Sequence, residues 1–145
     1  MTKNYLLVGI LMLILTSCSK DNEISEADKN DIIGKWFVTA EIWDGEKETL
    51  TDCGSGQYFQ FTAEKEAYLK FVDTDEGCDY EISKGTYEVN GDKLTLKDLT
   101  NADELIYDFD IIKLNSTDLI IETIFTDNEP GYESEETYRV ELEKR

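Results

Sequence analysis

The side chains with obvious potential for chemistry in this chain are carboxylates, since it holds 33 aspartates and glutamates and no histidine. Two carboxylates that flank a bond are enough for glycoside hydrolysis, but no pair stands apart from the general acidity. Histidine is the commonest general base and metal ligand, and this chain lacks it. Neither a Gly-x-Ser-x-Gly motif nor a glycine-rich phosphate loop occurs. The sequence therefore predicts a protein that is not an enzyme and has no catalytic residues.

Clustered carboxylates could instead hold a hard cation such as Ca²⁺. Asp73-Thr74-Asp75-Glu76-Gly77 is one such cluster, but its glycine comes one place too early for an EF-hand. Lys84 stands where that loop needs a bidentate glutamate. A second cluster comprises Asp127, Asn128, Glu129, Glu133, Glu135 and Glu136. Solvated acidic loops account for both clusters, so we expect no metal site and no cofactor.

The first 17 residues differ from the rest of the chain. Lys3 is their only charge, residues 6–15 are apolar apart from one glycine, and Thr16-Ser17 follows with small side chains. This layout is typical of a secretory signal peptide. A membrane-spanning helix needs about 20 apolar residues, so a short anchor or a buried helix is the weaker alternative. We predict that residues 1–17 are a signal peptide and that the protein is exported.

Leu15-Thr16-Ser17-Cys18 resembles the lipobox of bacterial lipoproteins. In that motif the cysteine thiol receives a diacylglycerol before the signal is cut, and small residues let the peptide bond enter a narrow protease site. Two or more acyl chains, such as palmitate, give stable anchoring. We expect lipidation of Cys18 to hold the protein in the cell envelope, on the outer membrane of a bacterium.

Two further cysteines, Cys53 and Cys78, remain once Cys18 is lipidated. A pair of cysteines in an exported chain favours a disulfide. The alternatives are two buried thiols or half of a metal site, and zinc is poorly supported without histidine or Cys-x-x-Cys. We predict a disulfide between Cys53 and Cys78.

The formal net charge of the chain is −19. Nucleic-acid binding depends on lysine and arginine that neutralise phosphates, so this excess of acid argues against it. The charge favours solubility and self-repulsion, or it attracts a cation or a basic partner. Residues 18–31 are charged and aperiodic, which predicts a lipidated acidic tether. At roughly 3 Å per residue, that tether spans up to about 40 Å.

From Ile32 onward, apolar and polar residues alternate with a period near two, which predicts short antiparallel strands. Asn90-Gly91-Asp92 predicts a hairpin turn, because Asn-Gly supplies positive φ angles. Closure of the sheet would remove its exposed edges. The fold class is therefore all-β, with residues 32–145 forming an eight-stranded antiparallel up-and-down β-barrel. The predicted strands cover about 34–43, 57–62, 67–72, 85–89, 94–97, 104–114, 119–125 and 136–143.

The alternation also predicts which side chains face the interior. In the first strand it places Trp36, Val38, Ala40 and Ile42 inside and Phe37 and Trp43 outside. In the last strand it places Tyr138, Val140 and Leu142 inside and Arg139 outside. An eight-stranded barrel is either just filled by side chains or holds one small ligand. The aromatic residues that fill the core or line a pocket there are Trp36, Phe59, Phe61, Phe71, Tyr87, Tyr107 and Phe109.

Gly34-Lys35-Trp36 resembles the Gly-x-Trp motif that opens the lipocalin barrel. In lipocalins the tryptophan packs across the closed end and the glycine permits a close approach of chain. The lipobox, acidic tether, cysteine pair and Asn-Gly-Asp hairpin also resemble lipocalin-like lipoproteins of Bacteroidetes-type bacteria. The chain departs from true lipocalins in lacking Thr-Asp-Tyr and the helix after the barrel, and Arg139, the candidate to stack on the tryptophan, has outward parity.

The resemblance implies a membrane-anchored, non-enzymatic barrel that binds a small apolar or amphipathic ligand in the envelope. A second hypothesis is a protein-interaction module, such as an inhibitor of a basic envelope enzyme steered by the acidic charge. A third is an accessory subunit of a surface glycan-uptake complex. A cavity of a few hundred Å³ favours the first hypothesis, whereas a filled barrel with an exposed Trp43 favours the second.

Overall fold

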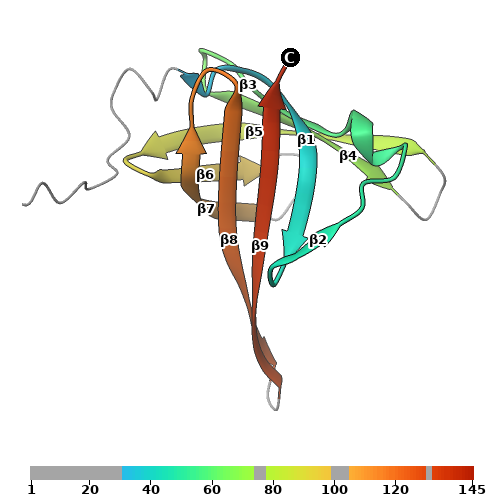
Figure 1. The fold of residues 1–145 in the computed structure, drawn as a ribbon. Coiled ribbons are helices and arrows are strands. Elements are labelled where there is room, and N and C mark those ends of the chain that lie inside the picture. The colour runs from blue at the N-terminus through green and yellow to red at the C-terminus, as the bar shows by residue number, and fades with distance from the viewer. Residues whose placement is uncertain (1–30, 74–77, 99–104, 130–131) are drawn as a thin grey trace, which may run out of the picture.

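The computed structural model describes residues 31–73, 78–98, 105–129 and 132–145 (Figure 1). The predicted signal peptide, Cys18 and the tether up to residue 30 lie outside these ranges. The described elements are β1 (Gly34–Trp43), β2 (Glu46–Glu48), η1 (Gly54–Gly56, one 3-10 turn), β3 (Tyr58–Phe61), β4 (Glu66–Asp73), β5 (Asp79–Asn90), β6 (Lys93–Asp98), β7 (Leu105–Leu114), β8 (Asp118–Glu129) and β9 (Tyr132–Lys144).

The strands form one antiparallel sheet that closes on itself. From β3 to β9 each strand pairs with the next along the chain, and β1 pairs with both β3 and β9. Strand β2 is a short addition beside the second half of β1. The predicted eight-stranded up-and-down β-barrel is therefore confirmed. The described core cluster runs from Ile32 to Leu142, and β1 closes the sheet against β9, so residues 31–145 hold the strands that close the barrel.

The predicted strands are all present, but some are longer than the alternation indicated. Strand β5 begins at Asp79 rather than at residue 85, and β8 and β9 extend into a long hairpin. Figure 1 shows that hairpin reaching beyond the rest of the barrel. Strand β2 was not predicted. It follows a turn in which Asp44 (φ 48°) and Gly45 (φ 83°) both take positive φ, the geometry that favours Asp-Gly in two-residue hairpins.

Trp36 closes one end of the barrel, as the Gly-x-Trp resemblance implies. Its side chain is 0% exposed and its Nε1 donates a hydrogen bond to the carbonyl oxygen of Ile32, at 2.6 Å. The Lys144 Nζ lies 4.9 Å from the Trp36 ring centroid and donates to the Asp31 carbonyl at 2.9 Å. Gly34 (φ 139°) makes room for this lysine, because a Cβ there would lie 2.5 Å from Lys144 Cε.

Arg139 points outward, as the alternation predicts. Its Nε donates to the Glu122 carboxylate of β8 at 2.7 Å on the outer face. The cation that stacks on Trp36 is therefore Lys144, which follows the inward parity of Val140 and Leu142.

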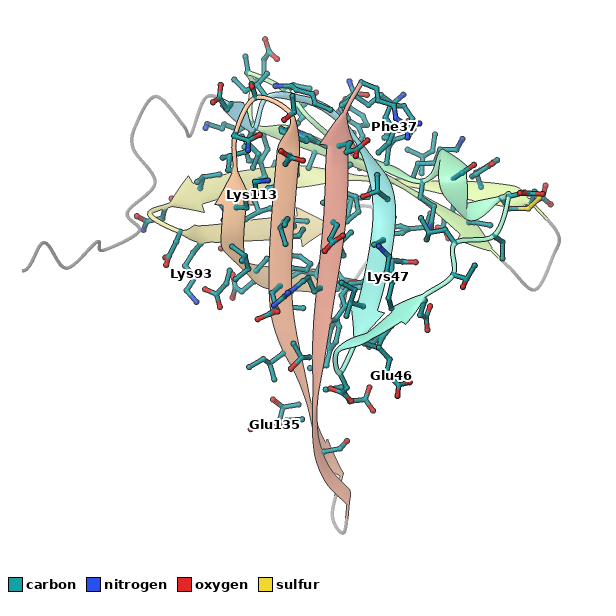
Figure 2. The ribbon with its side chains drawn as sticks, in the orientation of Figure 1. Phe37, Glu46, Lys47, Lys93, Lys113 and Glu135 are labelled. Atoms are coloured by element: carbon teal, nitrogen blue, oxygen red, sulfur yellow. A yellow bond between two sulfur atoms is a disulfide. The ribbon has the colours of Figure 1, made fainter. Side chains whose placement is uncertain are left out.

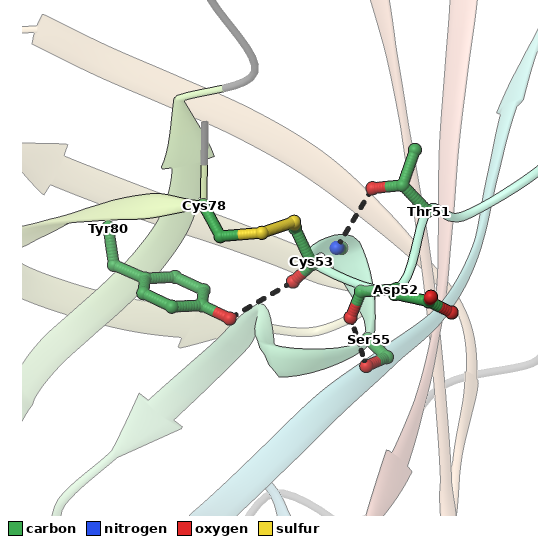
Figure 3. The surroundings of a disulfide bond; sticks show 7 residues. Thr51, Asp52, Cys53, Ser55, Cys78 and Tyr80 are labelled. Carbon is green, nitrogen blue, oxygen red and sulfur yellow. Dashed lines mark hydrogen bonds between the residues drawn. A yellow bond between two sulfur atoms is a disulfide. The ribbon is translucent and has the colours of Figure 1, made fainter. Parts of the chain in front are cut away.

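Cys53 and Cys78 form the predicted disulfide, with their Cα atoms 5.3 Å apart (Figure 3). It joins the start of η1 to the residue before β5. The Tyr80 hydroxyl donates to the Cys53 carbonyl at 3.3 Å, and the Thr51 hydroxyl accepts from the Gly54 amide at 3.2 Å. The bond therefore fixes the crossing from β2 to β3 against the wall of the barrel.

Replacing Gly34 with alanine should destabilise the fold. The new Cβ meets Lys144 Cε, and the residue keeps a positive φ that side chains disfavour, at a cost of about 1–3 kcal/mol. Urea unfolding of residues 31–145 measures this loss. Gly54→Ala is the matched control, since a Cβ there meets its neighbours at an ordinary 3.6 Å. Equal stabilities for the two variants would show that Gly34 is not needed for closure.

Removing the disulfide should also lower the free energy of unfolding. Cys53 and Cys78 are 25 residues apart, and the chain-entropy model gives about 3–4 kcal/mol for a loop of that length. The variant with both Cys53→Ser and Cys78→Ser should lose that amount in urea unfolding. Its midpoint should also be insensitive to reductant, whereas that of the unmodified protein should fall on reduction. A midpoint unchanged by both treatments would contradict a stabilising role.

Candidate functional site

A cavity of about 270 Å³ occupies the half of the barrel opposite Trp36. Its wall is mostly apolar, because the alternation of β3, β4, β7 and β8 turns large side chains inward. Phe109 is buried, whereas Phe71 and Tyr107 are only partly buried. The aromatic residues that line it are Phe59, Phe71, Tyr107, Phe109, Phe125 and Tyr138.

The seven predicted interior residues divide between this cavity and the closed end. Phe59, Phe71, Tyr107 and Phe109 line the cavity. The other three lie in the core without lining it: Trp36, Phe61 and Tyr87.

The three closed-end residues are fixed by their own contacts. The Phe61 and Tyr87 rings pack edge to face with centroids 4.9 Å apart. The Tyr87 hydroxyl donates to the Thr62 carbonyl at 2.8 Å, and burial raises the pKa of this tyrosine. These side chains form the floor of the barrel, so the space for a ligand lies above them.

A β-bulge in β1 corrects part of the predicted alternation. Val38 pairs with Leu142 and Ala40 pairs with Glu141, so one extra residue, Thr39, lies between them. A one-residue insertion turns every following side chain to the other face. Ala40 is buried but lies outside the main core cluster, because it pairs with an outward-facing residue.

Beyond the bulge the inner and outer positions of β1 are exchanged. Ile42 pairs with outward-facing Arg139, whereas Trp43 pairs with inward-facing Tyr138. The predictions that Ile42 faces inward and that Trp43 faces outward are therefore wrong. Phe37, which precedes the bulge, does face outward and packs against Tyr58 (Figure 2).

Trp43 joins an aromatic group at the open end. Its ring centroid lies 4.3 Å from that of Tyr138 and 5.8 Å from that of Phe125. Both partners line the cavity. Sequence reasoning missed Trp43 and Phe125 as interior candidates, although Phe125 had the correct alternation in its strand.

The bulge also brings a carboxylate inside the barrel. Glu41 pairs with inward-facing Val140 and is partly buried. The Tyr138 hydroxyl donates to Glu41 Oε1 at 2.7 Å. Burial, together with the Glu41 carboxylate, holds the pKa of Tyr138 well above its usual range, so this hydroxyl stays a donor at neutral pH. No sequence motif indicated this pair.

The remaining polar wall comes from β5, where Glu81 and Ser83 line the cavity at inward positions. Lys84 borders it from the outward row, where its ammonium pairs with Glu66 at 2.7 Å. That contact raises the pKa of Lys84 and lowers that of Glu66. The lysine is therefore engaged on the outer face.

Within the described ranges, no three cysteine, aspartate or glutamate side chains converge as metal ligands. Asp75 and Glu76, the centre of the first acidic cluster, lie outside those ranges. Glu135 and Glu136 of the second cluster are exposed on β9. In the part of the chain that the structure describes, no helix is long and apolar enough to cross a membrane.

Solved structures of similar fold come from bacteria and from an insect. A lipocalin-like protein from Bacteroides uniformis matches with a TM-score of 0.57 and 15% identity, covering 79% of this chain and 99% of that one. An uncharacterized protein from Bacteroides eggerthii matches with a TM-score of 0.54 and 12% identity, covering 78% and 98%. Insecticyanin from the tobacco hornworm Manduca sexta matches with a TM-score of 0.58 and 13% identity, covering 84% and 66%.

These identities are low, so the three structures establish the shared fold alone. No curated protein sequence matches the chain significantly. The family model of the lipocalin-like domain matches residues 32–121. This match spans the barrel from the chain before Trp36 into β8, more than half of the sequence. The chain therefore belongs to the lipocalin-like domain family.

Proposed function

We propose that this protein is a non-enzymatic lipoprotein, anchored through acyl chains on Cys18 to the outer membrane of a bacterium, whose barrel binds a small apolar or amphipathic ligand. Family membership supports a binding role. The apolar segment before Cys18 supports export and anchoring. The residues that would form the anchor are separate from those that would bind the ligand, so the two parts of the proposal are tested separately.

The aromatic cavity is the observation that carries the binding role. At about 270 Å³ it lies just below the usual range of ligand pockets, about 300–1,000 Å³. It therefore suits a small ligand, or one end of a longer chain. Trp36 and Lys144 close the opposite end, so a ligand would pass between the strand ends near Trp43.

The protein-interaction alternative would be favoured by an exposed Trp43 and a filled interior. Trp43 is instead partly buried, and its ring packs on that of Tyr138, which lines the cavity. The acidic exterior still supports the protein-interaction alternative, since acidic surfaces speed the encounter with basic proteins. The cavity favours ligand binding as the leading proposal.

Filling the cavity should abolish binding of an apolar probe. Leu69 lines it, so Leu69→Trp should reduce the affinity of residues 31–145 for an environment-sensitive naphthylamine dye at least tenfold, because the indole takes the dye's space. Ile82→Trp, on the outer face of β5 with 52% exposure, is the matched control. Dye fluorescence titration gives both affinities. Absence of saturable binding by the unmodified barrel would overturn the binding role.

Lipidation should depend on Cys18 alone. We expect the full-length chain, expressed in a bacterial host with radiolabelled palmitate, to carry label in the membrane fraction. Cys18→Ala should remove the label, because no thioether can form. The variant with both Cys53→Ser and Cys78→Ser should keep it. An unlabelled wild-type chain, or label that survives Cys18→Ala, would refute the anchor.

A further inference from the structure

The charged side chains at inward positions of the open half are acidic throughout the described residues. Glu41 lies on β1 beyond the bulge, Glu81 lines the cavity from β5, and Glu136 pairs with inward-facing Phe125. Asp79 continues the inward row of β5 at its outer end. In Figure 2 the labelled Glu46 and Glu135 lie toward the same end as the β8–β9 hairpin. The open end of the barrel therefore carries a negative potential inside and at its rim.

The cations near this region belong to the outer face. Lys84 and Lys97 border the cavity, but each follows the outward parity of its strand. Lys93 and Lys113 are also outside, paired with Asp110 and Asp118 (Figure 2). No lysine or arginine within the described ranges forms an ion pair with Glu41. An anionic ligand would therefore meet carboxylates at the inward positions, whereas the bordering lysines stand at outward positions.

The Glu41 carboxylate is joined to the aromatic group of the open end through Tyr138. The Tyr138 ring lines the cavity while its hydroxyl binds Glu41, and Trp43 packs on that ring. Aromatic faces attract ammonium groups, tryptophan most strongly. A carboxylate beside such faces is a common way to hold a desolvated cation, because charge-assisted hydrogen bonds add to the attraction of the rings.

We propose that the barrel selects ligands with an apolar body and a cationic, ammonium-type head, which binds between the Glu41 carboxylate and the rings of Trp43 and Tyr138. The apolar body lies against Phe59, Phe71 and Phe109. This inference rests on the proposed ligand-binding function and specifies its ligand class. The acidic exterior acts in the same direction, since a net charge of −19 raises the local concentration of cations.

Three ligands with the same eight-carbon chain and different heads test the selection: octylammonium, 1-octanol and octanoate. Calorimetric titration of residues 31–145 should give affinities that fall in that order, with octylammonium at least tenfold tighter than octanoate. These ligands are water-soluble, so the titration can be repeated on the full-length mature protein in neutral vesicles. Added salt should weaken octylammonium binding and leave octanol binding unchanged.

Variants assign the selection to Glu41. Glu41→Gln should weaken octylammonium binding about tenfold and leave octanol binding unchanged, because glutamine still accepts the Tyr138 hydrogen bond. Glu88→Gln removes the same charge from the outer row of β5 and should alter neither affinity. Trp43→Leu should also weaken octylammonium binding more than octanol binding.

The outcomes separate this inference from the proposed function. Binding of none of the three ligands, together with no dye binding, would refute the ligand-binding function itself. Equal binding of all three, or tighter binding of octanoate, would refute the cation selection while leaving a binding barrel. Equal losses for Glu41→Gln and Glu88→Gln would show that overall charge, rather than this site, attracts the cation.

Discussion

The ladder between β1 and β9 is the contact on which the rest of the structure depends. It joins residues more than 90 positions apart, from Trp36 with Lys144 to Trp43 with Tyr138. Closure pairs the backbone groups that an open sheet would leave exposed at its edges. Closure also gives the sheet an inner and an outer face. Alternate residues of a strand therefore point either into the buried interior or into solvent. Both the closed end and the aromatic group at the open end take residues from this one ladder.

Alternation along the chain was enough to predict the barrel and its eight strands, because burial on one face forces a period of two. It also placed Tyr138, Val140 and Leu142 inside. The lengths of the strands were harder to predict. The first half of β5 pairs with β4 alone, and the end of β8 pairs with β9 alone, so neither segment is flanked by strands on both sides. The β1–β2 hairpin did carry a turn signal, Asp44-Gly45, but the three residues of β2 that follow it are all charged and do not suggest a strand.

The aromatic wall of the site could be predicted from the sequence, whereas the group that specifies its chemistry could not. Phe59, Phe71, Tyr107 and Phe109 follow the alternation of their own strands, so their shared cavity could be anticipated. Glu41 and Trp43 could not be placed, because their orientation depends on the bulge at Thr39. That bulge depends on how β1 and β9 register across the closed barrel, where the Thr39 hydroxyl donates to the Glu141 carbonyl at 3.0 Å. No local pattern in either strand encodes this register.

The bulge itself argues that the open end is built for binding rather than for stability. Without it, the parity of β1 would bury Ile42 and leave Glu41 and Trp43 in solvent. Full burial of an isoleucine side chain stabilises a fold by about 1.5–3 kcal/mol, and a partly buried carboxylate opposes folding unless it is hydrogen-bonded. With the bulge, Trp43 packs inward in place of Ile42, so the unfavourable part of the exchange is the Glu41 carboxylate, with the Tyr138 hydroxyl as the compensating donor. An arrangement that is unfavourable for a filled core becomes favourable once a cation occupies the space beside Glu41.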